Sequence, residues 1–323
     1  MKFLRGILFP LALYLGTTSI AGAAPYPEQP IRLVVPFGAG SGADIVARQI
    51  AQSMALQLRQ PVVVENKTGA GGNIAAGQVA KAAADGYTIM LGSTGPLTVN
   101  ASLYDTVPYD PLKDFSPISV VAIGPMVIAV RADSPIKNLG DLVARAARSA
   151  KPLSYGSSGI GSGPHLAALL LERSTGISMT HIPYRGTADA VNDLLGGSTD
   201  MAFSGVPTVL PSVQAGKIRI LAASADNTIP ALSEVPTTVQ AGYKDTDLAV
   251  FYGLVAPAGT PREIIDTLNA AVVRSVADAE MKARFATLGL MPHATTSAQF
   301  FDLIKTDSAR WHDIIKSSNM TAE

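Results

Sequence analysis

The chain has 323 residues, 25 basic and 25 acidic side chains, 47% apolar residues and no cysteine, and this length is typical of about two domains. The balanced charge argues against nucleic acid as a partner, because neutralising phosphates requires a concentrated surplus of Lys and Arg. The absence of cysteine excludes disulfides, thiolate metal sites, a cysteine nucleophile and a lipid anchor attached through cysteine.

Residues 1–24 have the pattern of a signal peptide that is cleaved on export. Lys2 and Arg5 precede an apolar stretch over 6–20, and small residues end the segment. A membrane anchor needs about 20 apolar residues in a row, whereas Pro10 interrupts this shorter stretch. We therefore expect a soluble mature chain in the periplasm, where ATP and NAD are scarce, and we predict no cofactor.

Strand and helix patterns alternate through the first third of the mature chain. Buried strands are predicted at 31–37, 62–65 and 87–91. Helical periodicity over 44–58 and from 72 to about 84 separates them. Because glycine-rich loops follow these strands, the pattern predicts a parallel sheet with right-handed crossovers.

The same order recurs later in the chain with little residue identity. The predicted elements are strands at 153–155, 180–184 and 200–203 and helices at 165–174 and 188–195. This repeat of order and spacing predicts a second parallel sheet. Ligands bind beyond the carboxyl ends of such strands, so two lobes that face each other through these loops would enclose a cleft.

Two segments, 120–132 and 218–225, are expected to connect the lobes. Lobe 2 is predicted to span 125–221, and lobe 1 to comprise 25–124 and 222–323. The last hundred residues add a predicted strand at 251–256 and helices at 261–277, 279–288 and 297–317.

Backbone groups at the helix starts are the main candidates for binding. A helix that follows a glycine turn presents free N–H groups and a partial positive charge, and glycine lets a ligand approach closely. Helix starts after Gly42 and Gly163 would hold one carboxylate or phosphate from both lobes. Alternatively, the glycines only end strands and cap helices, and Asp44 in a first turn favours capping. Asp189 is a candidate for receiving an amino group or the proton of an acid.

Other motifs give little support to catalysis or metal binding. Gly38-x-Gly40-x-x-Ala43 matches only the loosest dinucleotide fingerprint, and the export signal argues against it. Phosphate-loop and Gly-x-Ser-x-Gly motifs are absent, and the four histidines lack metal-ligand spacing. We predict no catalytic residue and no metal site, and His165 at a helix start is a candidate ligand contact.

Five blocks of sequence, spread over the mature chain, carry one shared pattern. They are Pro30-Ile-Arg-Leu-Val-Val-Pro-Phe-Gly-Ala-Gly40, Val64-Glu-Asn-Lys-Thr-Gly-Ala-Gly-Gly72, Tyr155-Gly-Ser-Ser-Gly-Ile-Gly-Ser-Gly-Pro-His165, His181-Ile-Pro-Tyr-Arg-Gly186 and Tyr252-Gly-Leu-Val-Ala-Pro-Ala-Gly-Thr-Pro261. This pattern resembles the Bug family, the periplasmic solute receptors of tripartite tricarboxylate transporters. The resemblance implies an α/β, two-lobed periplasmic binding protein (type II-like). Each lobe would be a mostly parallel sheet flanked by helices, and a two-segment hinge would join the lobes.

The resemblance also implies a site. A ligand carboxylate would be held by backbone groups and bridging waters from the loops at 37–44 and 156–165, and loops after other strands would line the rest. The predicted ligand-binding residues are Phe37, Gly38, Ala39, Gly40, Ser41, Gly42, Asp44, Gly92, Ser93, Thr94, Gly156, Ser157, Ser158, Gly161, Ser162, His165, Gly186, Thr187, Asp189, Ser204 and Gly205.

We therefore predict a non-catalytic receptor for a small organic carboxylate, which is a dicarboxylate, an acidic amino acid or an aromatic acid. It would act as a monomer, deliver its ligand to integral-membrane permease subunits and meet the membrane only through that transporter. Two alternatives stay open. One is a ligand-sensing partner of a membrane histidine kinase, and the other is an exported enzyme acting on a carboxylic acid.

Overall fold

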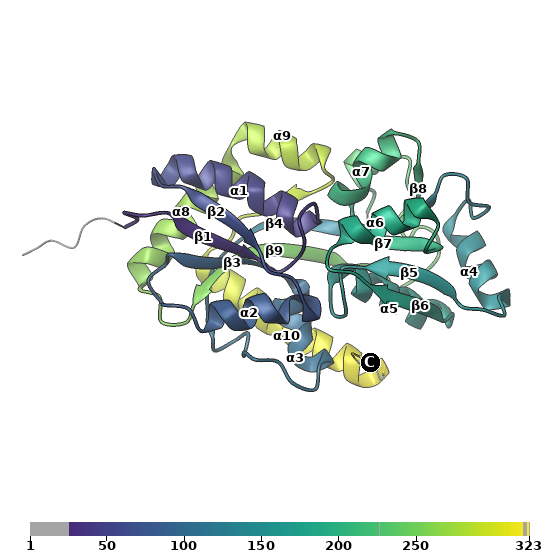
Figure 1. Ribbon diagram of the computed structural model, residues 1–323, viewed down its shortest axis with the longest axis horizontal. Helices are drawn as coiled ribbons and strands as arrows, with labels where there is room; N and C mark the ends of the chain where they lie inside the picture. Colours follow the sequence, from purple (N-terminus) through teal and green to yellow (C-terminus); the bar gives the residue numbers. More distant parts are fainter. Residues whose placement is uncertain (1–25, 226, 319–321, 323) are drawn as a thin grey trace, which may run out of the picture.

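The strands of the protein form two sheets, A and B, that share the long strand β4 (Phe115–Arg131). This computed structural model describes residues 26–225, 227–318 and 322, so the predicted signal peptide lies outside the described residues. Figure 1 shows sheet A with its helices on the left and sheet B with its helices on the right. The molecule is thus an α/β structure of two bodies joined through a common strand.

Sheet A places β1 (Ile31–Val35) between two parallel neighbours, β2 (Val62–Asn66) and β3 (Thr88–Ser93). Strand β9 (Ala249–Pro257) pairs antiparallel with both β3 and β4, and the short β10 (Met291–Pro292) pairs with β4. The strand order in this sheet is β2-β1-β3-β9-β4. We call these strands, β4 excepted, and the helices packed on them half A.

Helices cover both faces of sheet A. Ile31, Leu33 and Val35 share one hydrophobic core with α1, α8 and α9, whereas Val34 belongs to a second core with α2 and α10. Successive strand residues point to opposite faces, so a strand covered on both faces is apolar throughout. The helices of half A are α1 (Gly42–Leu58), α2 (Asn73–Ala80), α3 (Asn100–Leu103), α8 (Arg262–Ala277), α9 (Ala279–Thr287) and α10 (Ser297–Ser318).

Half B comprises β5 to β8 and α4 to α7. Strand β5 (Leu153–Ser157) lies between the parallel strands β6 (Met179–Pro183) and β7 (Met201–Gly205), while β7 and β8 (Ile218–Ser224) pair antiparallel with β4. Its helices are α4 (Leu139–Arg148), α5 (Gly163–Thr175), α6 (Thr187–Gly196) and α7 (Val206–Gln214). Both halves therefore contain the predicted three-strand parallel unit, and antiparallel strands complete each sheet.

Strand β4 changes partners at the junction between the halves. It pairs with β9 as far as Pro125 and with β7 and β8 from Met126 onward. The first predicted connection, 120–132, falls on this strand. The second, 218–225, falls mainly on β8, which stays in sheet B; the chain returns between Ser224 and Leu248, where Leu248 N donates to Ser224 O at 3.1 Å. The predicted lobe boundaries remain a prediction.

Several helices differ from the sequence-based expectation, and the short α3 was not predicted. Helix α2 ends at Ala80 rather than near residue 84, because Ala82 N donates back to Val79 O at 3.0 Å in a tighter turn. Helices α4 and α7 were not predicted. Pro211 lies inside α7, and an internal proline normally argues against a helix. Across the described residues, the structure contains no helix that is both long and apolar enough to span a membrane.

Candidate functional site

A cavity of about 30 Å³ lies between half A and half B. It lies among the loops that follow β1, β3 and β5 to β7, where helices α1, α5 and α6 begin. The lining residues are Phe37, Ser41, Gly42, Ala43, Ser93, Met126, Ser158, Gly163, Pro164, Thr187, Gly205, Val250 and Tyr252. None of these side chains is charged, so among the described residues no Lys or Arg lines the cavity to pair with an anion.

Half A contributes the N-terminus of α1. Ser41 is the N-cap residue, and its Oγ accepts a hydrogen bond from Asp44 N at 3.3 Å. The N–H groups of Gly42 and Ala43 have no hydrogen-bond partner within the described part of the chain. These two unpaired donors at a positive helix end can receive an anion.

Half B contributes the starts of α5 and α6 from the opposite side. Gly163 and Thr187 are the first residues of these helices, and their N–H groups also lack a partner among the residues that the structure describes. The N-cap of α5 is Ser162, whose hydroxyl donates to Gly159 O at 2.6 Å. Ser162 therefore fixes the turn before α5, while the next residue faces the cavity.

Hydroxyl groups supplement the backbone donors. For Ser93, Ser158, Thr187 and Tyr252, no side-chain hydrogen bond is found within the described residues, and all four line the cavity. Burial raises the pKa of the Tyr252 hydroxyl above its ordinary value, so it stays protonated and neutral. The cavity thus combines neutral donors from both halves, which suits an acceptor such as a carboxylate.

Asp44 is turned away from the cavity. Its carboxylate accepts from Gly40 N at 2.9 Å and Asn66 Nδ2 at 2.9 Å, and it forms an ion pair with Arg48 at 2.9 Å. Burial raises the pKa of this carboxyl, but the hydrogen bonds from these three partners outweigh burial and hold the pKa below its usual range. Asp44 therefore fixes the loop before α1, as its capping interpretation suggests, and does not line the cavity.

His165 also serves the loop rather than the cavity. Its Nδ1 accepts from Gly161 N at 3.1 Å, and its ring stacks on His181 with centroids 4.3 Å apart. Burial, together with the neighbouring His181, lowers the pKa of His165 to about 3, and burial lowers that of His181 to about 4. Both rings are therefore neutral near pH 7, and His165 positions the turn between β5 and α5.

Seven of the predicted ligand-binding residues line the cavity: Phe37, Ser41, Gly42, Ser93, Ser158, Thr187 and Gly205. The others lie in the same loops but have other roles or are exposed. Thr94 Oγ1 accepts from Phe251 N, and the hydroxyls of Ser157 and Ser204 bond within half B. The remaining positions that do not line the cavity are Gly38, Ala39, Gly40, Asp44, Gly92, Gly156, Gly161, Ser162, His165, Gly186 and Asp189.

Six lining residues were not among the individually predicted ones: Ala43, Gly163 and Pro164 lie within the predicted loops 37–44 and 156–165, whereas Met126, Val250 and Tyr252 lie outside every predicted loop. Gly163 and Pro164 belong to a predicted loop, and proline near a helix start is a known signal. Tyr252 lies directly opposite Ser93 in the antiparallel register of β3 and β9. That pairing joins residues 159 positions apart, and nothing local in the sequence indicates it.

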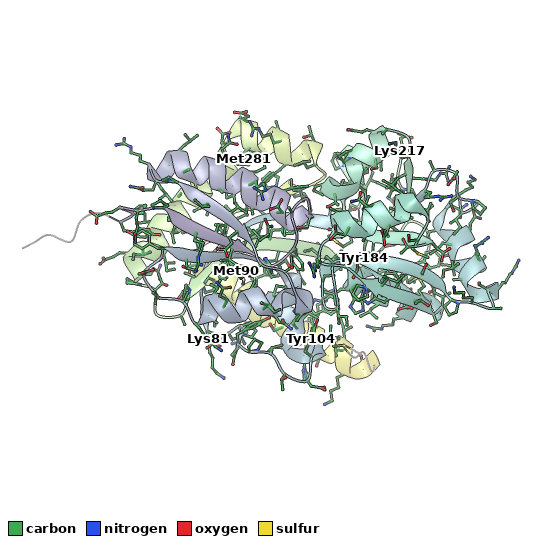
Figure 2. All side chains as sticks on the ribbon, in the orientation of Figure 1. Lys81, Met90, Tyr104, Tyr184, Lys217 and Met281 are labelled. Atoms are coloured by element: carbon green, nitrogen blue, oxygen red, sulfur yellow. The ribbon has the colours of Figure 1, made fainter. Side chains whose placement is uncertain are left out.

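The halves touch on several sides of the cavity. Gly38 N donates to Arg185 O at 3.1 Å, and Tyr104 Oη donates to Ile160 O at 2.8 Å. Figure 2 labels Tyr104, which lies near the junction between the two halves. At Gly161, with a φ of +77°, a Cβ would collide with the Asn100 side chain of half A. These contacts hold the halves close together and keep the cavity small.

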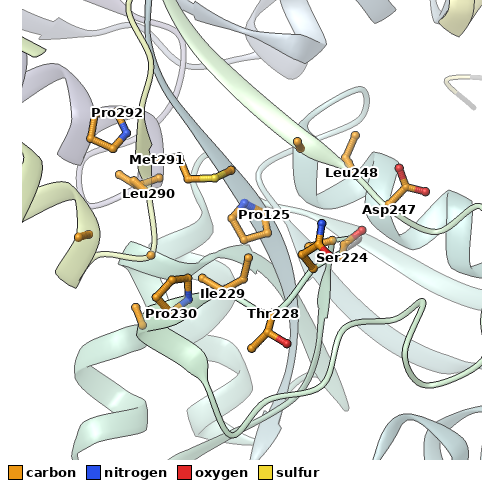
Figure 3. Close-up of a pocket in the computed structure, with 16 residues that line it drawn as sticks. Pro125, Ser224, Thr228, Ile229, Pro230, Asp247, Leu248, Leu290, Met291 and Pro292 are labelled. Atoms are coloured by element: carbon orange, nitrogen blue, oxygen red, sulfur yellow. The ribbon is translucent and has the colours of Figure 1, made fainter.

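A larger pocket lies on the other face of the connecting strands (Figure 3). It has a volume of about 420 Å³ and an apolar lining that includes Ile229 and Leu248. Pro125 and Ala249 line this pocket, whereas their chain neighbours Met126 and Val250 line the small cavity, as strand alternation requires. Among the described residues that line it, the charged one is the acidic Asp247, and neither Lys nor Arg is present, so this pocket offers no positive charge to an anionic ligand.

Comparison with known proteins identifies the family. A sequence model described as the tripartite tricarboxylate transporter family receptor matches residues 46–320. The chain belongs to this family. Protein BugT of Bordetella pertussis (strain Tohama I) is 33% identical over 316 residues, which cover 97% of this chain and 97% of BugT. The predicted resemblance to the Bug family, whose members are periplasmic solute receptors, is therefore confirmed.

Solved structures of this receptor family share the fold. An R. palustris protein determined with adipate has a TM-score of 0.88 and 34% identity, covering 91% of this chain and 99% of that protein. MatC from Rhodopseudomonas palustris with bound malate has a TM-score of 0.86 and 31% identity, covering 90% of this chain and 100% of MatC. The periplasmic binding protein BugD has a TM-score of 0.87 and 35% identity, covering 92% of this chain and 99% of that structure. The predicted periplasmic-binding-protein fold is therefore confirmed.

Proposed function

We propose that this receptor binds a small organic carboxylate in the cavity between half A and half B. The observation that carries this proposal is the meeting of unpaired helix N-termini and hydroxyls from both halves in a cavity without charged side chains. Adipate and malate, the ligands of the two related structures, are both dicarboxylates, which agrees with an anion as the ligand.

The proposed contacts are main-chain N–H groups that donate from both half A and half B. Gly42 and Ala43 would donate from α1, and Gly163 and Thr187 would donate from α5 and α6. Hydrogen bonds to a charged group contribute roughly 1.5–3 kcal/mol each, and each helix dipole adds roughly 0.3–2 kcal/mol. A ligand of about ten heavy atoms can thus reach ~8 kcal/mol, which corresponds to micromolar affinity.

Binding requires the two halves to separate and close. A volume of about 30 Å³ holds only a few water molecules, and a dicarboxylate is larger. We therefore propose that the lobes predicted from the sequence move about the β4 junction, and that the ligand complex is slightly more open than this structure. A ligand enclosed between the lobes would give the receptor a distinct loaded form.

We further propose that the mature chain is periplasmic, is not an enzyme and hands its ligand to the membrane subunits of a tripartite tricarboxylate-type transporter. Against catalysis, no hydroxyl that lines the cavity is hydrogen-bonded to a His, Asp or Glu side chain within the described part of the chain. Two of the candidate acid–base groups, Asp44 and His165, form hydrogen bonds that hold the loops before α1 and α5 and do not line the cavity. The family model, which describes a transporter receptor, supports delivery to a permease.

Calorimetry on the mature chain, refolded to remove any copurified ligand, tests the proposal. The panel would hold dicarboxylates, tricarboxylates, acidic amino acids and aromatic acids. We expect at least one acid to bind with one-to-one stoichiometry at micromolar Kd and to be recovered chemically intact. If no acid bound more tightly than millimolar, the carboxylate assignment would be wrong.

A further inference from the structure

Tyr252 is the one aromatic hydroxyl that lines the cavity. It lies on β9, directly opposite Ser93 on β3, and only 5% of its surface is exposed. Its ring belongs to the core of half A, so the side chain is anchored at one end and presents its hydroxyl at the other. This geometry holds the oxygen in a fixed place at the cavity wall.

The hydroxyl of Tyr252 lies beside helix starts from both halves. A Cβ built on Gly42 would be 2.9 Å from Tyr252 Oη, and a Cβ built on Gly205 would be 3.5 Å from it. Gly42 begins α1 in half A, whereas Gly205 is the N-cap of α7 in half B. The oxygen therefore lies between half A and half B, at a place that we call the seam, where the positive ends of α1 and α7 favour negative charge.

Two tyrosines of half A near the cavity, the partly buried Tyr104 and the buried Tyr109, have hydrogen-bond partners. Tyr104 Oη donates to Ile160 O at 2.8 Å, and Tyr109 Oη donates to Pro96 O at 2.7 Å. No such partner is found for Tyr252 Oη among the described residues, and this oxygen is not one of the fully buried polar atoms without a partner, so it is open to the cavity that Tyr252 lines. The helix starts beside Tyr252 Oη present N–H donors. The hydroxyl can therefore donate its own proton to an acceptor that enters the cavity.

We propose that Tyr252 is a specificity-determining residue of the receptor: its hydroxyl donates a hydrogen bond to a ligand oxygen at the seam between the halves. This inference rests on the proposed carboxylate site and adds a contact outside the glycine-rich loops. A site built to donate to a ligand oxygen discriminates against analogues that lack it, because its donor is then left unpaired. Tyr252 thus selects acids that place an oxygen between α1 and α7.

The variant Tyr252→Phe removes only the hydroxyl oxygen. We expect the Kd of the tightest acid to rise roughly 10–100-fold, as loss of a hydrogen bond to a charged group requires, with little change in thermal stability of the unliganded protein. The matched control is Tyr109→Phe, which removes a buried hydroxyl that bonds inside half A. It should lower thermal stability and leave the Kd within about twofold.

Selectivity provides a second readout that a purely structural role would not move. Wild type and Tyr252→Phe would be titrated with pairs of acids that differ by one oxygen-bearing group, such as malate with succinate and succinate with butyrate. We expect at least one pair to be discriminated by the wild type about tenfold more strongly than by the variant.

The outcomes separate this inference from the proposed function. Binding of an acid by the wild type, with Tyr252→Phe unchanged in Kd, would refute the role of Tyr252 and leave the carboxylate site intact. Weaker binding with every discrimination ratio unchanged would also refute a specificity role. Failure of the wild type to bind any acid would overturn both proposals.

Discussion

Gly42→Ala places a methyl group at the start of α1, where we propose that the ligand meets the backbone. The Cβ would lie 2.9 Å from Tyr252 Oη, closer than ordinary van der Waals contact. The cavity holds only a few water molecules, and a methyl group is similar in size to one of them. The substitution therefore obstructs the cavity itself.

The expected loss follows from the contacts that the methyl group blocks. One hydrogen bond to a charged group contributes roughly 1.5–3 kcal/mol, so the Kd of a bound carboxylate should rise about 10–150-fold by calorimetry. Stability should change little, because alanine suits a helix better than glycine by ~0.4–1 kcal/mol, which offsets the tight contact with Tyr252.

Gly196→Ala is the matched control for this substitution. Gly196 is the last residue of α6, and a Cβ there would meet nothing within 4 Å. We expect it to bind every ligand as the wild type does. Wild-type affinity in Gly42→Ala as well would refute the placement of the ligand against the start of α1.

Three further predictions concern closure and stability. Gly161→Ala should raise the Kd of every ligand by a similar factor, roughly tenfold or ~1.4 kcal/mol, because its Cβ collides with Asn100 across the junction. The control Gly176→Ala has a φ of +70° and nothing within 4 Å of the added Cβ, so it should lower only the stability. Equal calorimetric affinities in both variants would contradict the role of the Gly161–Asn100 contact in closure. Asp44→Asn should lower the free energy of unfolding in urea by about 1–2 kcal/mol at pH 7. Because the folded-state pKa of Asp44 is lowered, the stability it contributes is present above its unfolded pKa of ~3.9 and is lost as the pH falls below it through the folded-state pKa. A deficit that did not shrink as the pH was lowered would contradict this explanation. The buried pair His165 and His181, with pKa values of about 3 and about 4, stays neutral in the fold while the unfolded chain takes up protons below ~6.5. Stability should therefore fall on acidification from pH 6.5 towards 4, by up to ~1.4 kcal/mol per pH unit for each histidine, and His165→Gln should show about half of that slope in urea unfolding.

Local patterns predicted the elements that build the site. Strand β1, the glycine turn after it and helix α1 follow one another in the sequence. The structure places them within a few residues of the expected bounds. Helix α4 was missed although Asn138 and Asp141 form a capping pair at its start, with Asp141 N donating to Asn138 Oδ1 at 2.8 Å. An Asn followed three residues later by Asp is thus a local signal for the start of this helix.

Orientation of side chains could not be predicted from local pattern. Whether Asp44 faces the cavity depends on Asn66, which is 22 residues away and reaches it only because β1 and β2 are neighbours. Tyr252 was missed because its place beside Ser93 depends on the pairing of β3 with β9. Such contacts depend on sheet order, which the spacing of strands along the chain does not specify.

The most direct test of the central claim is a crystal structure of the mature chain with its tightest-binding carboxylate. We predict carboxylate oxygens about 3 Å from main-chain nitrogens of α1 in half A and of α5 or α6 in half B. A ligand bound in the apolar pocket of Figure 3, or one whose carboxylate pairs with an arginine side chain outside the cavity, would contradict the account.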